Sequence, residues 1–207
     1  MLNLDNQERA FIYQWIGSLL SKELTQEQLS YYQNGHFDSL FELLGEMSFS
    51  QQVDALRNAL KSLQYDQLEL AADFTHCFLL EGSLSAIPYM SAYLQDEELS
   101  KALSLVDSYM KHYKLKVNKA QNEPSDHIGV LLSIFIKLIE DQNDEKQKEF
   151  VQIVLLSWLD LFQQQMNRKD EHVGHANQQY RATSAPEFVE TRFVHHPFTT
   201  VDVADVT

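Results

Sequence analysis

Apolar residues recur with a helical rhythm between positions 128 and 139, and this segment constrains the fold of the chain more than any other. The residues that keep the rhythm are Ile128, Leu131, Leu132, Phe135, Leu138 and Ile139. Side chains at these intervals share one face of an α-helix, and that face has to be buried against another element. A second run, from Phe150 to Phe162, is apolar over much of a helical circumference. We expect it to pass through the centre of a helical bundle.

Helix signals also fill the first half of the chain. Asp5 and Glu8 have the spacing of a capping box, and helical periodicity follows over residues 10–20. Further helices are expected at 25–32, 37–44, 50–60, 65–80 and 96–113, the one at 65–80 deeply buried. Residues 81–93 break the pattern but keep aromatic and apolar side chains, so this loop must pack on a core or on a ligand.

The composition agrees with an all-α fold. The 207 residues include only six glycines and four prolines, whereas Leu, Gln, Glu, Ala and Lys are plentiful. We predict a bundle of two helical halves, residues 1–113 and 126–167, joined by a linker or hinge at 114–125 and followed by an irregular tail at 168–207. Because such a hinge permits two protomers to exchange one half, we expect a monomer together with a homodimer.

The net charge of the chain argues against some classes of binding partner. Thirty acidic residues stand against 16 basic ones, for a formal net charge of −14. Nucleic-acid binding depends on Lys and Arg, so a nucleic-acid partner is not expected. The excess of acid either serves solubility or suits a cationic partner.

Targeting and redox signals point to the cytoplasm. The N-terminal residues lack the basic region and apolar run of a secretory signal. No stretch reaches the roughly 18 apolar residues of a membrane span, so no membrane insertion is expected. Cys77 is the single cysteine, and an internal disulfide is therefore impossible.

Signatures of an enzyme or a metal site are weak. The sequence contains neither a P-loop nor a dinucleotide-binding fingerprint. A structural zinc site needs well-placed ligands, and the candidates lie in the expected tail: His172, His175, His195 and His196. We predict no catalytic residue, no metal and no cofactor.

Chemistry is concentrated at Glu123-Pro124-Ser125-Asp126-His127, just before the apolar helix. Proline disfavours helical backbone at Glu123, so Ser125 or Asp126 can cap the helix, with His127 in its first turn. Alternatively, Glu123 and Asp126 leave negative charge exposed on a loop, where it would attract arginine. Two other functions stay open: a hydrolytic or nucleotide-handling enzyme that uses this loop, and a general helical adaptor.

Three motifs occur together in a fixed order. Glu123-Pro124-x-Asp126-His127 is preceded by Asp73-Phe74-x-x-x-Phe78-Leu79 and by Pro88-Tyr89-x-Ser91-x-Tyr93. In their order, spacing and helical context, these motifs resemble the TorD/DmsD family of redox-enzyme maturation chaperones over residues 5–165. Within that family the chain is most similar to the TorD branch, which serves trimethylamine N-oxide reductase.

The resemblance implies an all-helical cytoplasmic chaperone that is not an enzyme. Such chaperones bind the twin-arginine signal peptide and the body of a molybdoenzyme precursor. They prevent premature export and assist insertion of the molybdenum cofactor. Family members have also been linked to weak guanine-nucleotide binding, which no phosphate loop supports in this sequence.

The resemblance also implies a set of signal-peptide residues. Glu123 and Asp126 would receive the arginines beside an apolar groove. For Phe74 and Phe78, core packing remains an equally open interpretation, and His127 either tunes affinity with pH or hydrogen-bonds the loop. The full set is Asp73, Phe74, Phe78, Leu79, Pro88, Tyr89, Ser91, Tyr93, Glu123, Pro124, Ser125, Asp126 and His127. One departure is that the family usually closes with another amphipathic helix, whereas the residues after 167 are polar and irregular.

Overall fold

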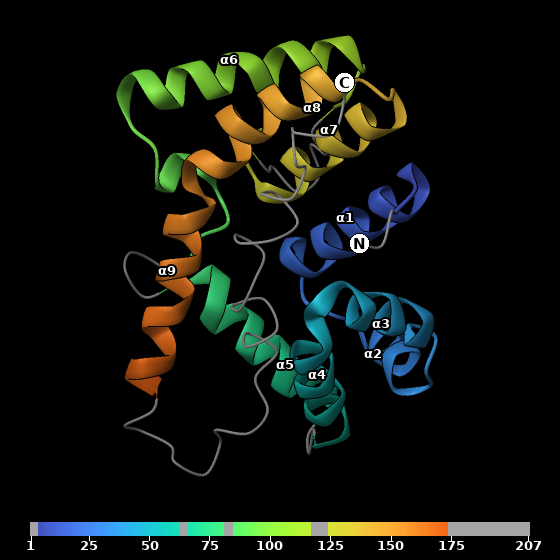
Figure 1. Cartoon of the computed structure of the whole chain (residues 1–207). Coiled ribbons are helices and arrows are strands. Elements are labelled where there is room, and N and C mark those ends of the chain that lie inside the picture. Colours follow the sequence, from blue (N-terminus) through green and yellow to red (C-terminus); the bar gives the residue numbers. More distant parts are fainter. Residues whose placement is uncertain (1–3, 63–65, 81–84, 117–123, 174–207) are drawn as a thin grey trace. The chain divides into compact units, whose positions relative to one another are not determined.

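The computed structural model describes the backbone of residues 4–62, 66–80, 85–116 and 124–173 (Figure 1). Within these residues every regular element is helical, and the β-type pairing is an isolated bridge between Tyr89 and His127. The predicted all-α class is confirmed. The α-helices are α1 (Asn6–Ser21), α2 (Gln26–Gln33), α3 (Asp38–Leu44), α4 (Ser50–Ser62), α5 (Asp66–Phe74), α6 (Asp96–His112), α7 (Ile128–Glu140), α8 (Asp144–Phe150) and α9 (Leu156–Val173). Shorter segments are the π-helical η1 (Gly45–Phe49), η2 (Thr75–Leu79) and η5 (Val151–Leu155), and the 3₁₀ turn η4 (Met90–Ala92).

The start of the first helix follows the expected capping chemistry. An Asp5 carboxylate oxygen accepts hydrogen bonds from the backbone N–H groups of Gln7 and Glu8, both at 2.8 Å. In return, the backbone N–H of Asp5 donates to the Glu8 carboxylate at 2.9 Å. The capping box satisfies N–H groups that an α-helix leaves without partners at its start. The predicted capping box is confirmed.

Contacts group the chain into two compact units. These units differ from the two consecutive halves expected from the sequence. Both α1 and α6 pack on α7, so the connection at 114–125 joins two helices of one unit. The physical reason is that α7 offers the most continuous apolar face, and α1 covers it despite its distance in sequence. Of the described residues, unit 1 contains 23–62, 66–80, 85–86 and 163–173, and unit 2 contains 4–22, 87–116 and 124–162.

The core of unit 2 is aromatic. The Tyr13 ring meets Phe135 edge-on with ring centroids 4.9 Å apart, and Phe135 stacks on Phe150 at 6.2 Å. Burial raises the pKa of Tyr13 to about 12. Trp158 on α9 is fully buried. The expectation that residues 150–162 run through the centre is confirmed for unit 2.

Unit 1 is held by a smaller cluster. The rings of Tyr32 and Phe37 stack with centroids 4.2 Å apart. The Arg57 guanidinium lies 5.7 Å above the Phe41 ring and forms an ion pair of 3.6 Å with Asp38. These contacts join α4 to α3, across a kink where Ser48 adopts a φ of 74°.

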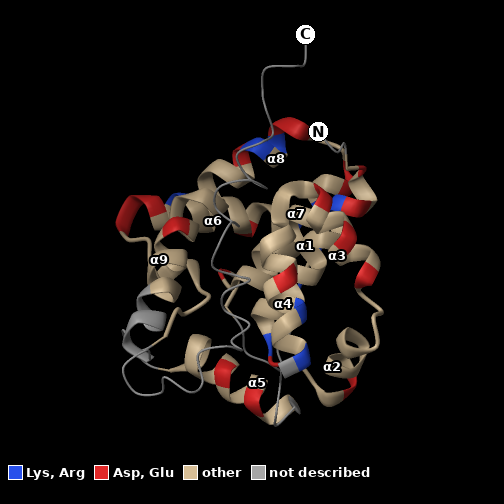
Figure 2. Cartoon of the chain, turned by 60° about the horizontal axis from the view of Figure 1, so that its bottom comes forward, with Lys and Arg blue, Asp and Glu red and all other residues tan. Residues whose placement is uncertain are grey.

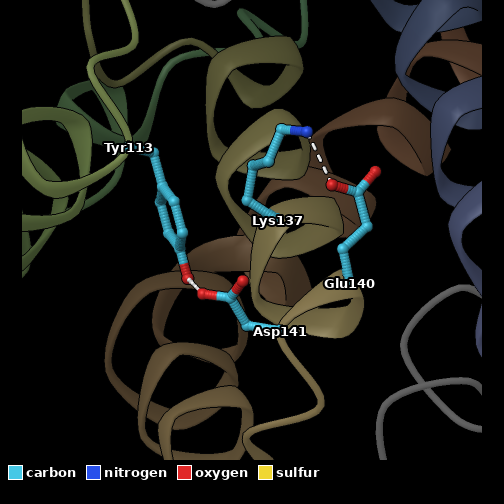
Figure 3. Close-up of polar contacts among 4 residues, drawn as sticks. All are labelled: Tyr113, Lys137, Glu140 and Asp141. Carbon is cyan, nitrogen blue, oxygen red and sulfur yellow. Dashed lines mark hydrogen bonds and ion pairs between the residues drawn. The ribbon is translucent and has the colours of Figure 1, made fainter.

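Two polar contacts lie near the C-terminal end of α7, one with the end of α6 and one within α7 itself (Figure 3). The Tyr113 hydroxyl donates to the Asp141 carboxylate at 2.6 Å, and Lys137 pairs with Glu140 at 2.6 Å. Burial, followed by the bond to Asp141, raises the pKa of Tyr113. The Tyr113–Asp141 bond thus joins the C-terminal ends of α6 and α7.

The helical region extends further than expected. We predicted an irregular tail from residue 168, but α9 continues to Val173. The additional residues include Arg168, Lys169 and Glu171, which are good helix formers even without an apolar face. The rest of the predicted tail, residues 174–207, lies outside the described residues.

Candidate partner-binding site

The predicted site residues fall into two groups, one in each compact unit. Asp73, Phe74, Phe78 and Leu79 belong to α5 and η2 of unit 1. The remaining described ones belong to unit 2: Pro88, Tyr89, Ser91, Tyr93, Pro124, Ser125, Asp126 and His127. Glu123 lies outside the described residues.

Within unit 2, the structure brings two of the motifs together. Tyr89 and His127 form an antiparallel bridge. The backbone N–H of Met90 donates to the Asp126 carbonyl at 3.1 Å, and the N–H of Ile128 donates to the Pro88 carbonyl at 3.0 Å. We call residues 88–93 and 124–129 together the crossing. Backbone pairing makes it a fixed framework for the side chains that it carries.

The carboxylate of Asp126 is buried in the crossing. The residue is 4% exposed, and its Oδ2 accepts a hydrogen bond from the backbone N–H of Ser91 at 2.9 Å. A buried charge is stable only when such donors compensate for the lost water. The expectation of an exposed carboxylate at Asp126 is therefore wrong. This side chain braces the loop at Ser91.

The imidazole of His127 caps α7. Its Nδ1 accepts a hydrogen bond from the backbone N–H of Gly129 at 3.1 Å, and the residue is 3% exposed. The ring also meets the Tyr89 ring edge-on, with centroids 4.9 Å apart. The prediction that Ser125 or Asp126 caps the helix is wrong. Asp126 is turned toward Ser91 instead, and the helix begins one residue later.

Gly129 is an important residue that the sequence reasoning missed. A Cβ at this position would collide with the Ser21 hydroxyl at the end of α1 and lie 3.2 Å from His127 Nδ1. Gly17, one turn earlier on α1, likewise faces Leu132, 3.6 Å from where its Cβ would be. Small residues therefore let α1 approach α7 next to the histidine cap. Glycines inside otherwise helical patterns were the available signal.

The other end of the crossing rests on aromatic side chains. The half-buried Tyr93 stacks on Trp158, with ring centroids 5.5 Å apart, and meets Phe162 edge-on at 6.0 Å. Burial raises the pKa of Tyr93 to about 12. Ser91, by contrast, is exposed. The segment thus combines the packed ring of Tyr93 with an exposed serine.

The unit 1 group is more open than we predicted. Leu79 is 62% exposed and Leu68 is 76% exposed, so the expectation of a deeply buried helix at 65–80 is wrong. Phe78 is buried, and its ring contacts the half-buried Phe74 at 5.1 Å. Core packing is therefore confirmed for Phe78. One face of the helix is packed and the other carries leucines toward solvent.

Asp73 belongs to the same helical segment and is half-buried. Burial raises the pKa of its carboxyl, and the charge of Glu69 raises it further, while His76 lowers it. A cation placed beside this partly desolvated carboxylate would stabilise its charged form. Its environment differs from that of Asp126, which already has a backbone donor.

Acidic residues are spread over helices of both units, with fewer basic ones among them (Figure 2). Among the residues that the structure describes, no group of three or more His, Cys, Asp or Glu is placed to hold a metal ion. Among the helices of the described residues, none is both long and apolar enough to cross a bilayer.

Comparison with known proteins gives consistent matches. Residues 46–164 match the family described as nitrate reductase delta subunit. The chain is 58% identical over 167 residues to the chaperone protein TorD of Aggregatibacter aphrophilus (strain NJ8700), covering 81% of each chain. It is 49% identical over 160 residues to the chaperone protein TorD of Actinobacillus pleuropneumoniae serotype 7, covering 75% of this chain and 80% of the relative. With the chaperone protein TorD of Vibrio vulnificus it shares 38% over 184 residues, covering 80% of this chain and 85% of the relative.

Proposed function

This chain belongs to the TorD family of chaperones, and on that premise we propose that it binds a molybdoenzyme precursor, together with its twin-arginine signal peptide, in the cytoplasm. Because its relatives are chaperones, the protein is a chaperone and not an enzyme. We further propose that binding delays export until the molybdenum cofactor has been inserted. The proposed client is trimethylamine N-oxide reductase.

The crossing is the observation that supports the peptide-binding part of this proposal most directly. Ser91, Ala92 and Pro124 are exposed at its surface, beside the half-buried rings of Tyr89 and Tyr93. Exposed residues next to half-buried rings suit an extended peptide, which can place apolar side chains on the rings. The net charge of −14 favours a peptide with a cationic head.

We assign the arginine contact to Glu123 and a positioning role to Asp126. The Asp126 carboxylate is buried and holds the Ser91 N–H, so a direct arginine contact would require it to give up that bond. Its proposed effect on the peptide is indirect, through the position of Ser91. Carboxylates bind arginine best when both oxygens are accessible.

We propose that the α5–η2 face of unit 1 contacts the apolar part of the precursor. Leu68 and Leu79 supply exposed apolar surface, and Asp73 supplies an acid beside it. An apolar segment covering the leucines would remove their surface from water, which is the main favourable term in such contacts.

Calorimetry with the full chain tests the peptide assignment. A twin-arginine peptide should bind, and the affinity should fall with salt because the contact is ionic. Glu123→Gln should weaken binding by about tenfold, the effect of losing one charged hydrogen bond. The matched control is Glu145→Gln, which removes an exposed acid from α8. No binding of either peptide or precursor to the intact chain would refute the function.

Asp126→Asn separates the two roles of the acidic residues. Asparagine keeps an oxygen that can accept from Ser91 but loses the charge. A positioning residue should then leave affinity within about threefold of wild type, whereas a direct arginine contact should lose as much as Glu123→Gln. The second result would overturn the assignment of Asp126.

The client is tested by recovering the chaperone from cells grown anaerobically and identifying the retained protein by mass. Trimethylamine N-oxide reductase precursor is the expected result. An unrelated partner would favour a general adaptor. Labelled guanosine triphosphate in equilibrium dialysis tests the weak nucleotide binding implied by the family resemblance.

We also propose that the protein forms monomers and a homodimer by exchange of helices across the 114–125 connection. Lys114, where this connection begins, has a φ of 54°. Left-handed backbone is unfavourable for a residue other than glycine, and an extended connection in the exchanged dimer would relieve this strain. Light scattering over a range of concentrations should resolve two species. A single monomeric species at every concentration would contradict the exchange.

A further inference from the structure

The indole N–H of Trp158 is a buried hydrogen-bond donor without an acceptor. The Trp158 side chain is fully buried in unit 2, and its Nε1 has no hydrogen-bond partner among the residues that the structure describes. An indole nitrogen can only donate, and a buried donor left unpaired costs free energy. Buried tryptophan N–H groups usually have a partner. The unpaired group therefore indicates an acceptor that the described residues do not supply.

Packing alone does not require a tryptophan at this position. The Trp158 ring contacts the rings of Tyr93 and Phe162, with centroids 5.5 Å away in both cases. A phenylalanine would keep aromatic contacts in this cluster and would bury no polar group. The indole nitrogen is thus the feature of Trp158 that needs a separate explanation.

Tyr93 is the member of this cluster that reaches the surface. It is half-buried, and its ring stacks on the indole at an interplanar angle of 27°, so it covers one face of Trp158. The backbone here is fixed, because the N–H groups of Tyr93 and Leu94 both donate to the Met90 carbonyl, at 3.1 and 3.0 Å. The Tyr93 ring can nevertheless turn about its side-chain torsions without breaking these bonds. Such a rotation would open the indole from that side.

Exposed apolar surface lies one helical turn from Trp158. Leu161, three residues further along α9, is 44% exposed, and residues three apart are neighbours on a helix surface. Ala92, next to Tyr93, is exposed as well. A peptide can cover Leu161 with an apolar side chain and remove that surface from water. The buried donor and the exposed leucine together suit a segment that offers both a backbone carbonyl and an apolar side chain.

We propose that Trp158 is a cryptic donor for the bound peptide: when the Tyr93 ring turns aside, the indole N–H donates a hydrogen bond to a backbone carbonyl of the peptide at the crossing. This inference rests on the proposed peptide binding and adds a subsite to it. Every residue of a peptide carries such a carbonyl, so the subsite recognises extended backbone and not a particular side chain. The bond forms where water is excluded, which strengthens it.

Calorimetry with the intact chain and a twin-arginine signal peptide tests the donor. Trp158→Phe should weaken binding about fivefold, the effect of losing one neutral hydrogen bond. The matched control is Trp15→Phe, the same change at the other tryptophan of the chain, on α1, which should stay within about twofold of wild type.

A set of modified peptides separates the hydrogen bond from packing. In each peptide one amide linkage is replaced by an ester, whose carbonyl is a weaker acceptor. One of these esters should weaken binding to wild type but not to Trp158→Phe, because only coupled partners show such non-additivity. A loss in Trp158→Phe that is the same for every ester would show packing alone and would overturn the donor.

Nitrogen–proton NMR of the wild-type indoles decides the question if Trp158→Phe does not fold. Trp15→Phe assigns the two indole signals, and saturation with the peptide should move the Trp158 proton downfield, because it gains an acceptor. An unchanged signal at saturation overturns the donor and leaves peptide binding standing. A signal that is already downfield without peptide also overturns it, since water or the chain itself then supplies the acceptor. If wild type binds no peptide at all, the proposed function is refuted and the subsite with it.

Discussion

The crossing of unit 2 and the α5–η2 helix of unit 1 both carry the motifs of one family, yet they are built in opposite ways. In the crossing, the charged residue Asp126 is buried and bonded to backbone. On α5–η2, the apolar residue Leu79 is exposed, and partial burial raises the pKa of the acid Asp73. The polar motif residue Asp126 therefore stabilises the backbone of its site, whereas the apolar motif residue Leu79 is exposed on the surface of its own.

The two acids provide the strongest test of this contrast. Asp126→Ala should lower the free energy of unfolding by about 3 kcal/mol, because a buried charged hydrogen bond is lost and the Ser91 N–H loses its acceptor. Asp73→Asn should change it by less than about 1 kcal/mol, because that carboxylate gains little from the fold. Urea unfolding measures both. Equal losses would show that the two acids have the same structural role.

The next largest difference in stability is expected between alanine substitutions at Gly129 in unit 2 and Gly45 in unit 1. Gly129→Ala should cost about 1–2 kcal/mol, because its Cβ would displace the Ser21 hydroxyl and crowd His127. Adding Ser21→Ala should restore part of the loss. Gly45→Ala in unit 1 is the control, since nothing lies within 4 Å of its added Cβ and its backbone is helical. Thermal unfolding should show Gly45→Ala equal to or slightly more stable than wild type. A similar loss at both glycines would remove the contrast.

The exposed Leu79 on α5–η2 should contribute to client binding but only slightly to the stability of the fold. Leu79→Ser should change the free energy of unfolding by less than about 0.5 kcal/mol, as surface substitutions usually do. Recovery of the proposed client should nevertheless fall. Phe78→Ser, one residue earlier and buried, should instead destabilise the chain. Normal client recovery by a stable Leu79→Ser variant would exclude this face from binding.

The smallest expected effect is the pH dependence of Asp73. Its folded pKa is raised above the ordinary value of 3.8, so the folded state binds the proton more tightly than the unfolded state. Its contribution is most favourable below 3.8 and is lost as the pH rises through the folded pKa. Asp73→Asn should therefore gain a fraction of 1 kcal/mol over wild type at about pH 7, discounted for partial exposure, and no advantage at about pH 3.5. Urea unfolding across this range checks the sign, with exposed Asp54→Asn as the control.

Local signals in the sequence were sufficient for most of the helices. The Asp5–Glu8 box is confirmed because capping depends on residues only three positions apart. The run from Ile128 is confirmed as α7 because its apolar period is unambiguous. In both cases the residues that decide the structure are close together in the chain.

The crossing could be predicted only in part, because its chemistry depends on distant partners. Asp126 and Ser91 are 35 positions apart, and nothing local indicates that one bonds to the other. Because the Asp126 carboxylate bonds to Ser91, His127 caps α7 in place of the expected Ser125 or Asp126. The pairing of α1 with α7 is similarly non-local, so the unit boundaries could not be placed by reading consecutive segments.

The partnership between α1 and α7 has a consequence for synthesis on the ribosome. Roughly a hundred residues separate Ser21 from Ile128, so α1 waits about 5–20 s for its partner at elongation rates of about 5–20 residues per second. Helices α2 to α5, in contrast, follow one another and can associate as they emerge. The first helix to be synthesised is thus among the last to be buried. Until then its exposed apolar face makes the nascent chain a potential substrate for other molecular chaperones.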